Sequence, residues 1–454
     1  MSEPMISVAG IRGIVGESLL PESFLRYILA FASLVEGGAV VVGGDTRLSR
    51  EMMRHLAFAG LASAGCEIHD IGLAPTPTVG FMVRELGARG GIAITASHNP
   101  AQWNAYKFFD SDGMFPGKQA NAQLLEIAAG GAFLRADYRH LGRVTPRADA
   151  IGRHVARICE AVNTAQIRAR RFRVTADCCN SVGGLILKPL FEQLGCEAEM
   201  FFTDIDREFQ RPPEPLPENL DELCGRVRAA GADIGFAVDP DADRLAIVDN
   251  TGRPIGEERT VALAAAAVLN RVRGPLVVNL STTRAMDDLA RRHGVQIFRT
   301  PIGEANVVQR IRASNAVIGG EGNGGVIYPP VHCGRDAATG VALILGAMAA
   351  GNATIAELNT QIPDYVMIKT KFDAAGMDMA MLARMMSNEF SDAVEIITTD
   401  GVKAVYADSW VHARASGTEP VVRVFAEAPT RQAAEALAAR AQKARGCADA
   451  DDAM

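Results

Sequence analysis

Short apolar strands alternate with amphipathic helical patterns along most of this chain, and this alternation limits the possible folds more than any other feature. A helix is predicted from Pro21, because Pro favours a first helical turn and Phe24 and Ile28 recur on one face. Such alternation is typical of α/β units, in which helices cover a largely parallel sheet. Strands are predicted at residues 40–42, 92–95, 173–177, 234–239, 276–280 and 317–319.

The length of the chain, 454 residues, exceeds that of a single domain and predicts about three or four domains. Composition changes at residues 135–150, 250–258 and 363–371. After the last of these, the segments become more β-like and end in a helix over residues 430–445 that Thr430 would cap. The chain is therefore divided into domains at residues 1–145, 150–255, 256–365 and 370–446, the last a smaller α+β unit.

Charge and cysteine usage exclude several classes of protein. Lys and Arg number 46 against 53 Asp and Glu, a net charge of −7, and no long basic block occurs, so no nucleic-acid partner is expected. The eight Cys include no C-x-x-C pair, which argues against zinc and a disulfide framework and favours reduced thiols in the cytoplasm. No targeting signal is recognisable at the start. Residues 337–356 are uncharged, but the Gly interruptions predict a buried helix and no membrane partner.

The strongest chemical motif is the run D-P-D-A-D-R at residues 239–244, directly after a predicted strand. Alternate spacing in an extended loop allows Asp239, Asp241 and Asp243 to point toward one place, and three carboxylates suit Mg²⁺. An EF-hand is rejected, because Arg244 stands where that loop needs Gly and Asn250 where it needs Glu. A solvated acidic turn is the alternative, although three crowded carboxylates without a cation are costly.

A second motif, T-A-S-H-N-P at residues 95–100, places the Ser97 hydroxyl on a polar loop directly after an apolar strand. Ser, Asn and Pro are also ordinary turn residues, so a plain turn remains possible. A hydrolase triad is disfavoured because no G-x-S-x-G elbow occurs and His98 is adjacent to Ser97. A nucleophile or phosphate carrier beside a metal fits the pattern better.

Two further loops could bind a substrate. The run R-A-S-G-T-E-P at residues 414–420 combines a guanidinium, hydroxyls and a glycine, which suits a phosphate dianion, and Arg423 follows it; the alternative is a capped turn. The run G-G-E-G-N-G-G at residues 319–325 is a weak dinucleotide motif, because no helix follows it. Glu321 and Asn323 could instead bind sugar hydroxyls, or the run could be a glycine turn. His332, near Arg335, could line the same cleft.

Polar clusters that follow strands should meet in one cleft, since ligands of open α/β sheets bind beyond the carboxyl ends of the strands. Together, the four motifs closely resemble those of the α-D-phosphohexomutase family, in order and spacing across nearly the whole chain. The glycine-rich loop looks most like the archaeal-type phosphoglucosamine mutase branch. The resemblance implies three α/β/α sandwich domains of similar topology and a smaller C-terminal α+β domain around a central cleft.

The resemblance also implies a mechanism. Phosphorylated Ser97 would donate its phosphoryl group to a hexose monophosphate, and the resulting hexose 1,6-bisphosphate would reorient and return its other phosphate. Mg²⁺ would be held by Ser97, Asp239, Asp241 and Asp243. Arg12 and Arg244 would stabilise the transferring group, with Lys107 as first and His98 as second candidate for proton transfer. The implied substrate-binding residues are Glu321, Asn323, Arg414, Ser416, Gly417, Thr418 and Arg423.

The substrate is less constrained than the reaction. In the family's sugar loop, the residues at the positions of Asn323 and Gly325 are commonly Ser and His. Glucosamine phosphate is favoured, with mannose and glucose phosphates as the alternative by the same mechanism. A metal-dependent sugar phosphatase and a non-catalytic phosphosugar-binding protein are the other classes. A monomer or a homodimer is expected.

Overall fold

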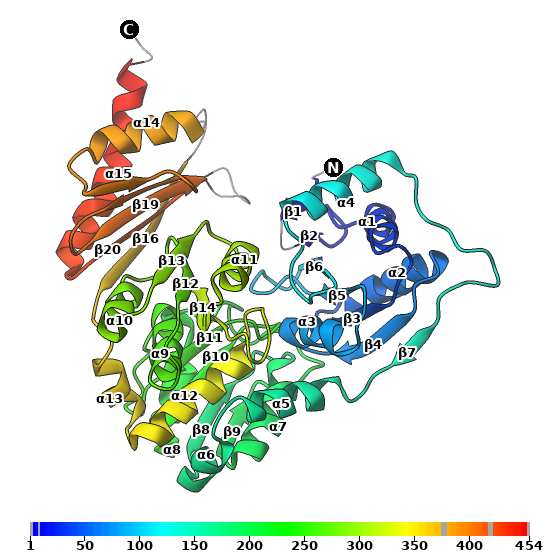
Figure 1. Cartoon of the computed structure of the whole chain (residues 1–454), viewed down its shortest axis with the longest axis horizontal. Coiled ribbons are helices and arrows are strands. Elements are labelled where there is room, and N and C mark those ends of the chain that lie inside the picture. Colours follow the sequence, from blue (N-terminus) through cyan, green and yellow to red (C-terminus); the bar gives the residue numbers. More distant parts are fainter. Residues whose placement is uncertain (1–2, 8–9, 374–378, 416–420, 452–454) are drawn as a thin grey trace.

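The computed structural model describes residues 3–7, 10–373, 379–415 and 421–451, and its strands form four separate sheets (Figure 1). The sheets follow one another along the chain. The first three carry helices on both faces, and the fourth carries its two helices on one face. The predicted fold class, three α/β/α sandwiches and a smaller C-terminal α+β domain, is confirmed.

The first sheet has seven strands in the order β1-β2-β6-β5-β3-β4-β7. Strand β3 pairs in parallel with β4 and β5, whereas β6 runs antiparallel to β5. Helices α1, α2 and α4 pack on one face and α3 on the other. The bounds are β1 Met5–Ser7, β2 Gly10–Ile14, α1 Pro21–Leu34, β3 Val40–Gly44, α2 Arg50–Ser63, β4 Ile68–Leu73, α3 Thr76–Glu85, β5 Gly90–Ile94, β6 Trp103–Phe109, α4 Lys118–Gly130 and β7 Val144–Pro146.

The second sheet has four strands in the order β11-β10-β8-β9, and only β11 is antiparallel to its neighbour. Strand β10 is buried along its whole length, as expected of a strand covered by helices on both sides. The bounds are α5 Ala150–Glu160, α6 Thr164–Arg170, β8 Arg173–Asp177, α7 Gly183–Leu194, β9 Glu197–Phe201, the 3₁₀ turn Pro217–Asn219, α8 Asp221–Ala230, β10 Ile234–Val238 and β11 Leu245–Val248.

The third sheet repeats this plan in the order β13-β12-β14-β15, again with one antiparallel edge strand. Its helix α12 packs against helices of the second sheet as well as its own, so the two sheets share one hydrophobic core. The bounds are α9 Glu257–Leu269, β12 Leu276–Asn279, α10 Ala285–His293, β13 Ile297–Thr300, α11 Glu304–Ser314, β14 Ile318–Glu321, β15 Gly325–Ile327, α12 Ala337–Gly351 and α13 Ile355–Thr360.

The fourth sheet is antiparallel in the order β16-β20-β19-β18-β17. Both of its helices contribute side chains to the same core cluster, so they cover the same face. Thr430 accepts a hydrogen bond from the backbone N–H of Ala433, as expected of a helix cap. The bounds are β16 Val366–Asp373, α14 Met379–Glu389, β17 Glu395–Ile397, β18 Val402–Val405, β19 Trp410–Ala415, β20 Val421–Ala428 and α15 Arg431–Asp451.

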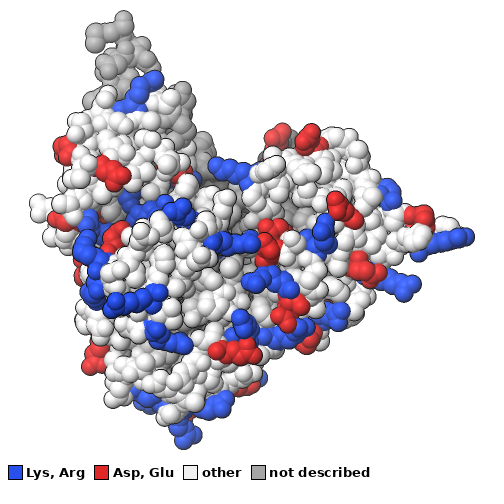
Figure 2. All heavy atoms as spheres, viewed as in Figure 1, with Lys and Arg blue, Asp and Glu red and all other residues white. Residues whose placement is uncertain are grey.

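The predicted strands all occur, with ends shifted by two residues or fewer, and the uncharged segment forms the buried helix α12. The predicted C-terminal helix begins as expected but continues to Asp451. Among the residues described, no helix combines the length and apolarity that a membrane crossing requires. Figure 2 shows acidic and basic side chains interspersed over the visible face, which is hollowed between the fourth and first sheets.

Candidate active site

The three carboxylates of the 239–244 loop lie together at the carboxyl end of β10. One oxygen from each of Asp239, Asp241 and Asp243 lies within 4.8 Å of the others, and all three side chains are fully buried. Ala242 adopts a left-handed conformation with φ +52°, which helps to turn the chain back into β11. The sequence prediction that alternate positions converge here is therefore confirmed as geometry.

Each carboxylate is held by the protein through at least one oxygen. Oδ1 of Asp239 accepts hydrogen bonds from the backbone N–H groups of Asp243 and Arg244, both at 3.1 Å. Oδ2 of Asp241 accepts from Lys107 Nζ at 2.6 Å and from Thr76 Oγ1 at 2.5 Å. The second oxygens of Asp241 and Asp243 are buried without a hydrogen-bond partner among the described residues. These orphaned anionic atoms fit a cation such as Mg²⁺.

The buried charges perturb one another. Burial, followed by the charges of Asp241 and Asp243, raises the pKa of Asp239 well above its ordinary value. Burial also raises that of Asp241, but the charge and hydrogen bond of Lys107 outweigh it, and the pKa of Asp241 falls below its ordinary value. Three adjacent carboxylates repel one another when all are ionised, and a divalent cation bound between them would offset this repulsion.

Ser97 lies against this loop. Its Oγ donates a hydrogen bond of 2.7 Å to Asp239 Oδ2, and its backbone has φ +49°, a conformation that non-glycine residues rarely adopt. The loop is held by Arg47, whose guanidinium donates to the carbonyl oxygens of Ser97 and Asn99 at 2.6 and 2.7 Å. Asp45 in turn pairs with Arg47 at 3.1 Å. The turn that carries the Ser97 hydroxyl is thus held in place by hydrogen bonds from Arg47 to its carbonyl groups.

One nitrogen atom contacts the Ser97 hydroxyl, and cationic side chains lie close to the residue that carries it. His98 Nδ1 lies 3.4 Å from Ser97 Oγ, and burial together with the charges of Arg244 and Arg12 lowers the pKa of His98 well below its ordinary value. Arg12 donates to Asn99 Oδ1 at 3.0 Å, and Arg244 pairs with Glu214. Burial lowers the pKa of Lys107, but the charges of Asp241 and Asp243 outweigh it and the pKa is raised. His98 is therefore neutral and Lys107 protonated at neutral pH.

The glycine-rich loop at 319–325 approaches the same centre from the third sheet. Glu321 is buried, and its Oε1 accepts from Asn279 Nδ2 at 2.9 Å and from the Gly303 N–H at 3.0 Å. Its Oε2 accepts from Arg335 Nη1 at 3.0 Å. Asn323 Oδ1 accepts from the Gly325 N–H at 3.2 Å, which tightens the turn. These hydrogen bonds hold the Glu321 carboxylate and the turn that follows it, and Arg335 links Glu321 to Asp243 of the Asp loop.

The predicted phosphate loop is described only in part, because Ser416, Gly417 and Thr418 lie outside the described residues. Arg414 on β19 and Arg423 on β20 are register partners in the fourth sheet. Arg414 Nε donates to Asp400 Oδ1 at 3.2 Å, and Asp400 Oδ2 accepts from the Ile302 N–H at 2.8 Å. Asp400 therefore ties the arginine of the fourth domain to the third domain.

Models of one family match four consecutive stretches of the chain. They are described as phosphoglucomutase/phosphomannomutase, alpha/beta/alpha domains I, II and III and the C-terminal domain, and they match residues 5–135, 152–252, 257–365 and 367–444. The chain belongs to the phosphoglucomutase/phosphomannomutase family. The α-D-phosphohexomutase resemblance predicted from the motifs is confirmed.

Relatives of this phosphohexomutase match it over nearly its whole length. A phosphoglucomutase/phosphomannomutase of Thermococcus kodakarensis is 38% identical, over 94% of this chain and 94% of its own. A probable phosphoglucosamine mutase of Methanopyrus kandleri is 34% identical, over 94% and 95%. A crystal structure of a phosphoglucomutase/phosphomannomutase family protein from Burkholderia thailandensis superposes with a TM-score of 0.85 at 28% identity, covering 98% of each chain. The protein is thus an enzyme of the isomerase class, an intramolecular phosphotransferase acting on phosphohexoses.

Some residues that contact the Asp loop or support the Ser97 turn are not predicted by the sequence analysis. Thr76, at the start of α3, contacts Asp241, and Arg47 supports the Ser97 turn. The motif G-D-T-R at 44–47 carried a signal for Arg47, since it follows a strand end next to the Ser97 strand. Thr76 and Arg335 had no such local signal, because only the packing of different domains brings them to the Asp loop.

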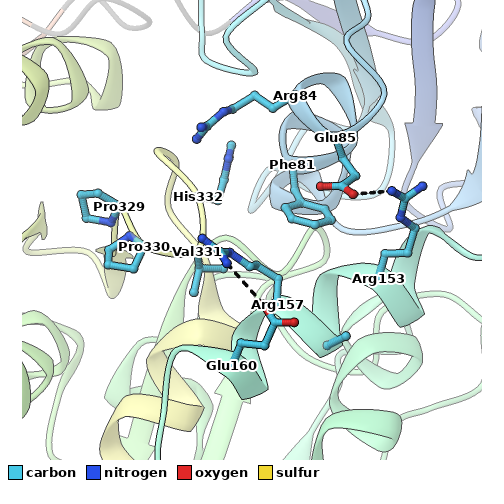
Figure 3. Close-up of a pocket in the computed structure, with 11 residues that line it drawn as sticks. Phe81, Arg84, Glu85, Arg153, Arg157, Glu160, Pro329, Pro330, Val331 and His332 are labelled. Atoms are coloured by element: carbon cyan, nitrogen blue, oxygen red, sulfur yellow. Dashed lines mark hydrogen bonds and ion pairs between the residues drawn. The ribbon is translucent and has the colours of Figure 1, made fainter.

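His332 lies in a different cavity from the one expected. It lines a pocket of about 460 Å³ between the first three domains, together with Phe81 and Arg84 (Figure 3). None of the Asp-loop residues lines this pocket. Burial lowers the pKa of His332 to about 3, so the side chain is neutral. The expectation that His332 lines the catalytic cleft is not supported.

Proposed function

We propose that this mutase moves a phosphoryl group between the 6- and 1-positions of a hexose, with glucosamine 6-phosphate to glucosamine 1-phosphate as the favoured reaction. The observation that carries the proposal is the 2.7 Å contact of Ser97 Oγ with Asp239, inside a cluster of carboxylates and guanidinium groups. A hydroxyl held this way suits a phosphoryl carrier better than a hydrolytic nucleophile, because Ser97 Oγ donates to Asp239 and its histidine neighbour, His98, has no carboxylate partner among the described residues to complete a Ser-His-Asp triad.

The transfer balances as two exchanges. Phosphoserine 97 gives its phosphoryl group to the O1 hydroxyl of a hexose 6-phosphate, so the P–Oγ bond breaks, a P–O1 bond forms, and the proton of that hydroxyl passes to Ser97 Oγ by way of an acid/base residue. The 1,6-bisphosphate then turns round and returns its 6-phosphoryl group to Ser97, so the P–O6 bond breaks, a P–Oγ bond forms, and the proton of the Ser97 hydroxyl passes to O6. A hexose 1,6-bisphosphate would therefore also activate an unphosphorylated enzyme.

Asp239, Asp241, Asp243 and a phosphoserine oxygen would hold Mg²⁺. When bound, the ion would offset charge on the transferring oxygens and on the carboxylates that raise the pKa of Lys107. Arg12 and Arg244, whose charges act on the neighbouring His98, would stabilise the charge of the transferring group. Lys107 is the first candidate for moving the hydroxyl proton and His98, already neutral, the second.

Substrate recognition would come from the third and fourth domains. Glu321 and Asn323 would bind sugar hydroxyls at the wall of the cleft. The phosphate that does not react would be held from the fourth domain. The residues proposed for this second role are Arg414, Ser416, Gly417, Thr418 and Arg423.

We also propose the domain roles that follow. Residues 1–145 would carry the phosphoserine, 150–255 the metal loop, 256–365 the sugar loop and 370–446 the phosphate loop. The four sheets follow these ranges except at two strands, since β7 ends at Pro146 and β16 begins at Val366. Limited proteolysis tests the division, since cuts should fall first in the segments that join one sheet to the next, and early cuts within a sheet would contradict it.

The choice of sugar is tested by a coupled mutase assay with Mg²⁺ and a trace of hexose 1,6-bisphosphate. Glucosamine, mannose, glucose and N-acetylglucosamine phosphates are compared by kcat/KM. We expect glucosamine phosphate to lead by about tenfold or more, which corresponds to about 1.4 kcal/mol of transition-state preference. The second candidate, a phosphoglucomutase/phosphomannomutase, is favoured by the name of the 38% identical relative, and a lead or tie for glucose or mannose phosphate would select it.

A further inference from the structure

Arg335 places one guanidinium among three carboxylates that come from different loops. Its Nη2 lies 2.6 Å from Asp243 Oδ2 and its Nη1 3.0 Å from Glu321 Oε2. Its Nε lies 3.0 Å from Glu304 Oε2, as an ion pair without a hydrogen bond. The side chain is 10% exposed, and its partners are 1%, 4% and 10% exposed. Removal of one partner from a buried ion pair is strongly destabilising, because the remaining charge is then buried without compensation.

The contact partners belong to the two loops with the clearest chemistry. Asp243 is a carboxylate of the metal loop in the second domain, and Glu321 is the carboxylate of the sugar loop in the third. Arg335 is the described side chain that contacts both. An arginine suits this position, since its planar fork presents several N–H groups in fixed directions, whereas a lysine offers a single nitrogen.

The glycine-rich loop is shaped around this side chain. A Cβ atom built on Gly325 would lie 2.2 Å from Arg335 Cδ and 2.8 Å from Cγ. Any larger residue at 325 must therefore displace the arginine. The backbone N–H of Arg335 also donates to Glu304 Oε1 at 3.2 Å, so main chain and side chain are held by the same carboxylate. Gly325 therefore leaves the space that the Arg335 side chain occupies, and the two residues form one structural unit.

The arrangement also determines which oxygen of Asp243 is available. Arg335 holds Oδ2 at 2.6 Å and Lys107 Nζ lies farther from it, at 3.5 Å, while Oδ1 is buried with no hydrogen-bond partner among the residues described and lies 3.9 Å from Arg244 Nε. Rotation of the carboxylate would break the ion pair with Arg335. The guanidinium therefore makes the shortest contact that holds the Asp243 carboxylate in place within the Asp cluster.

We propose that Arg335 is a positioning residue of this mutase, which orients Asp243 for the cation and Glu321 for the sugar and so couples the two binding events. The inference rests on the roles proposed above for the Asp loop and Glu321. Because binding coupling is reciprocal, a sugar phosphate should tighten metal binding by the same factor as the metal tightens sugar-phosphate binding.

The experiment measures Mn²⁺ binding to the full chain by electron paramagnetic resonance, with and without glucose 6-phosphate, in the Ser97→Ala background so that no turnover occurs. Two variants perturb the unit: Arg335→Lys keeps the charge and removes the fork, and Gly325→Ala keeps the arginine and displaces it. Arg259→Lys is the matched control, since Arg259 bonds mainly to carbonyl groups and Asn359, away from the Asp loop.

We expect both variants to weaken Mn²⁺ binding by about tenfold and to lose the tightening by glucose 6-phosphate. The control should keep both properties even if its melting temperature falls. When the same two substitutions are made in the enzyme that retains Ser97, kcat/KM should fall. The Mg²⁺ concentration needed for the half-maximal rate should rise. If Arg335→Lys does not fold, Gly325→Ala decides the question by the same two measurements.

Folded variants that bind Mn²⁺ within twofold of the parent and retain the coupling would overturn the inference. Failure of the wider proposal gives a different result. A Ser97→Ala enzyme that still turns over would refute the phosphoserine role but leave the Mn²⁺ comparison intact. If neither the Ser97→Ala parent nor the enzyme that retains Ser97 binds Mn²⁺, both the metal assignment and the role of Arg335 are overturned.

Discussion

Ser97 Oγ lies 2.7 Å from Asp239 Oδ2, although 142 residues separate them in the chain. The contact joins the first domain to the second at the ends of β5 and β10. It places the hydroxyl beside the carboxylates that could hold a metal ion. The position of Ser97 is therefore set by the packing of two domains rather than by its own loop alone.

Removal of this hydroxyl should abolish mutase turnover. Ser97→Ala leaves no atom to carry the phosphoryl group, so we expect kcat to fall by about 10³-fold or more. The measurement is the coupled assay with hexose 1,6-bisphosphate present, and mass spectrometry should find no phosphate at residue 97. Ser391→Ala, an exposed serine of the fourth domain, is the control and should leave the rate unchanged. Retained turnover in Ser97→Ala would refute the phosphoserine mechanism.

Neutralising one carboxylate of the Asp loop should weaken metal dependence. In Asp241→Asn the side chain keeps its size but loses its charge, so the Mg²⁺ concentration for half-maximal rate should rise about tenfold or more. Chelation of metal from the wild-type enzyme should stop turnover, and added Mg²⁺ should restore it. Asp249→Asn serves as control, because Asp249 caps a turn through Thr251 and Arg253 outside the cluster. An unchanged Mg²⁺ requirement in Asp241→Asn would argue against this loop as the metal site.

Asp400 should affect substrate binding more than chemistry. Asp400→Ala removes the acceptor for both Arg414 Nε and the Ile302 N–H, so the arginine of the fourth domain loses its support. We expect KM to rise about tenfold, as for loss of a charged hydrogen bond, with a smaller change in kcat. Steady-state kinetics test this. Asp392→Ala, whose carboxylate pairs with Arg440 on the same domain, should leave KM unchanged; an equal rise in both variants would point to general loss of the domain.

His412 should make the enzyme less stable in mild acid. Its Nε2 hydrogen-bonds the Asp400 carbonyl at 2.6 Å, so this nitrogen carries the proton, and Nδ1 accepts from Ser281 Oγ at 2.8 Å. Burial lowers the pKa of His412 from its ordinary 6.5 to about 4. The charges of Lys403 and Arg414 also lower this pKa, whereas the hydrogen bond and charge of Asp400 raise it. Below pH 6.5 the unfolded chain binds a proton that the folded one does not, so stability falls as pH decreases toward 4.

The expected loss between pH 7 and pH 5 is about 2 kcal/mol from this histidine. Denaturant unfolding at the two pH values measures it. His412→Gln, which does not titrate, should show a correspondingly smaller difference between the two pH values. The exposed His140→Gln should behave like wild type. If His412→Gln keeps the full wild-type loss, the acid sensitivity arises elsewhere.

The sequence was sufficient for features that depend on neighbours in the chain. The alternation of strands and helices predicted β8 at its observed bounds, and the start of α1 at Pro21 follows from proline's preference for the first helical turn. The D-P-D-A-D spacing predicted the convergence of Asp239, Asp241 and Asp243, but the extended loop expected to cause it is a tight turn, with Ala242 left-handed and its N–H donating to the Asp239 carbonyl. The motif order also indicated the family.

The tertiary structure decided which distant residues meet. Lys107, on the inner strand β6 beside β5, contacts Asp241 of the second domain, 134 residues away in the chain. Arg335 reaches Asp243 and Glu321, while His332, three residues earlier, lies in a separate pocket. Local sequence signals report backbone preference and periodicity, which extend over a few residues. Which side chain enters a shared cleft depends on the packing of whole domains, and that is determined by buried surfaces far apart in the chain.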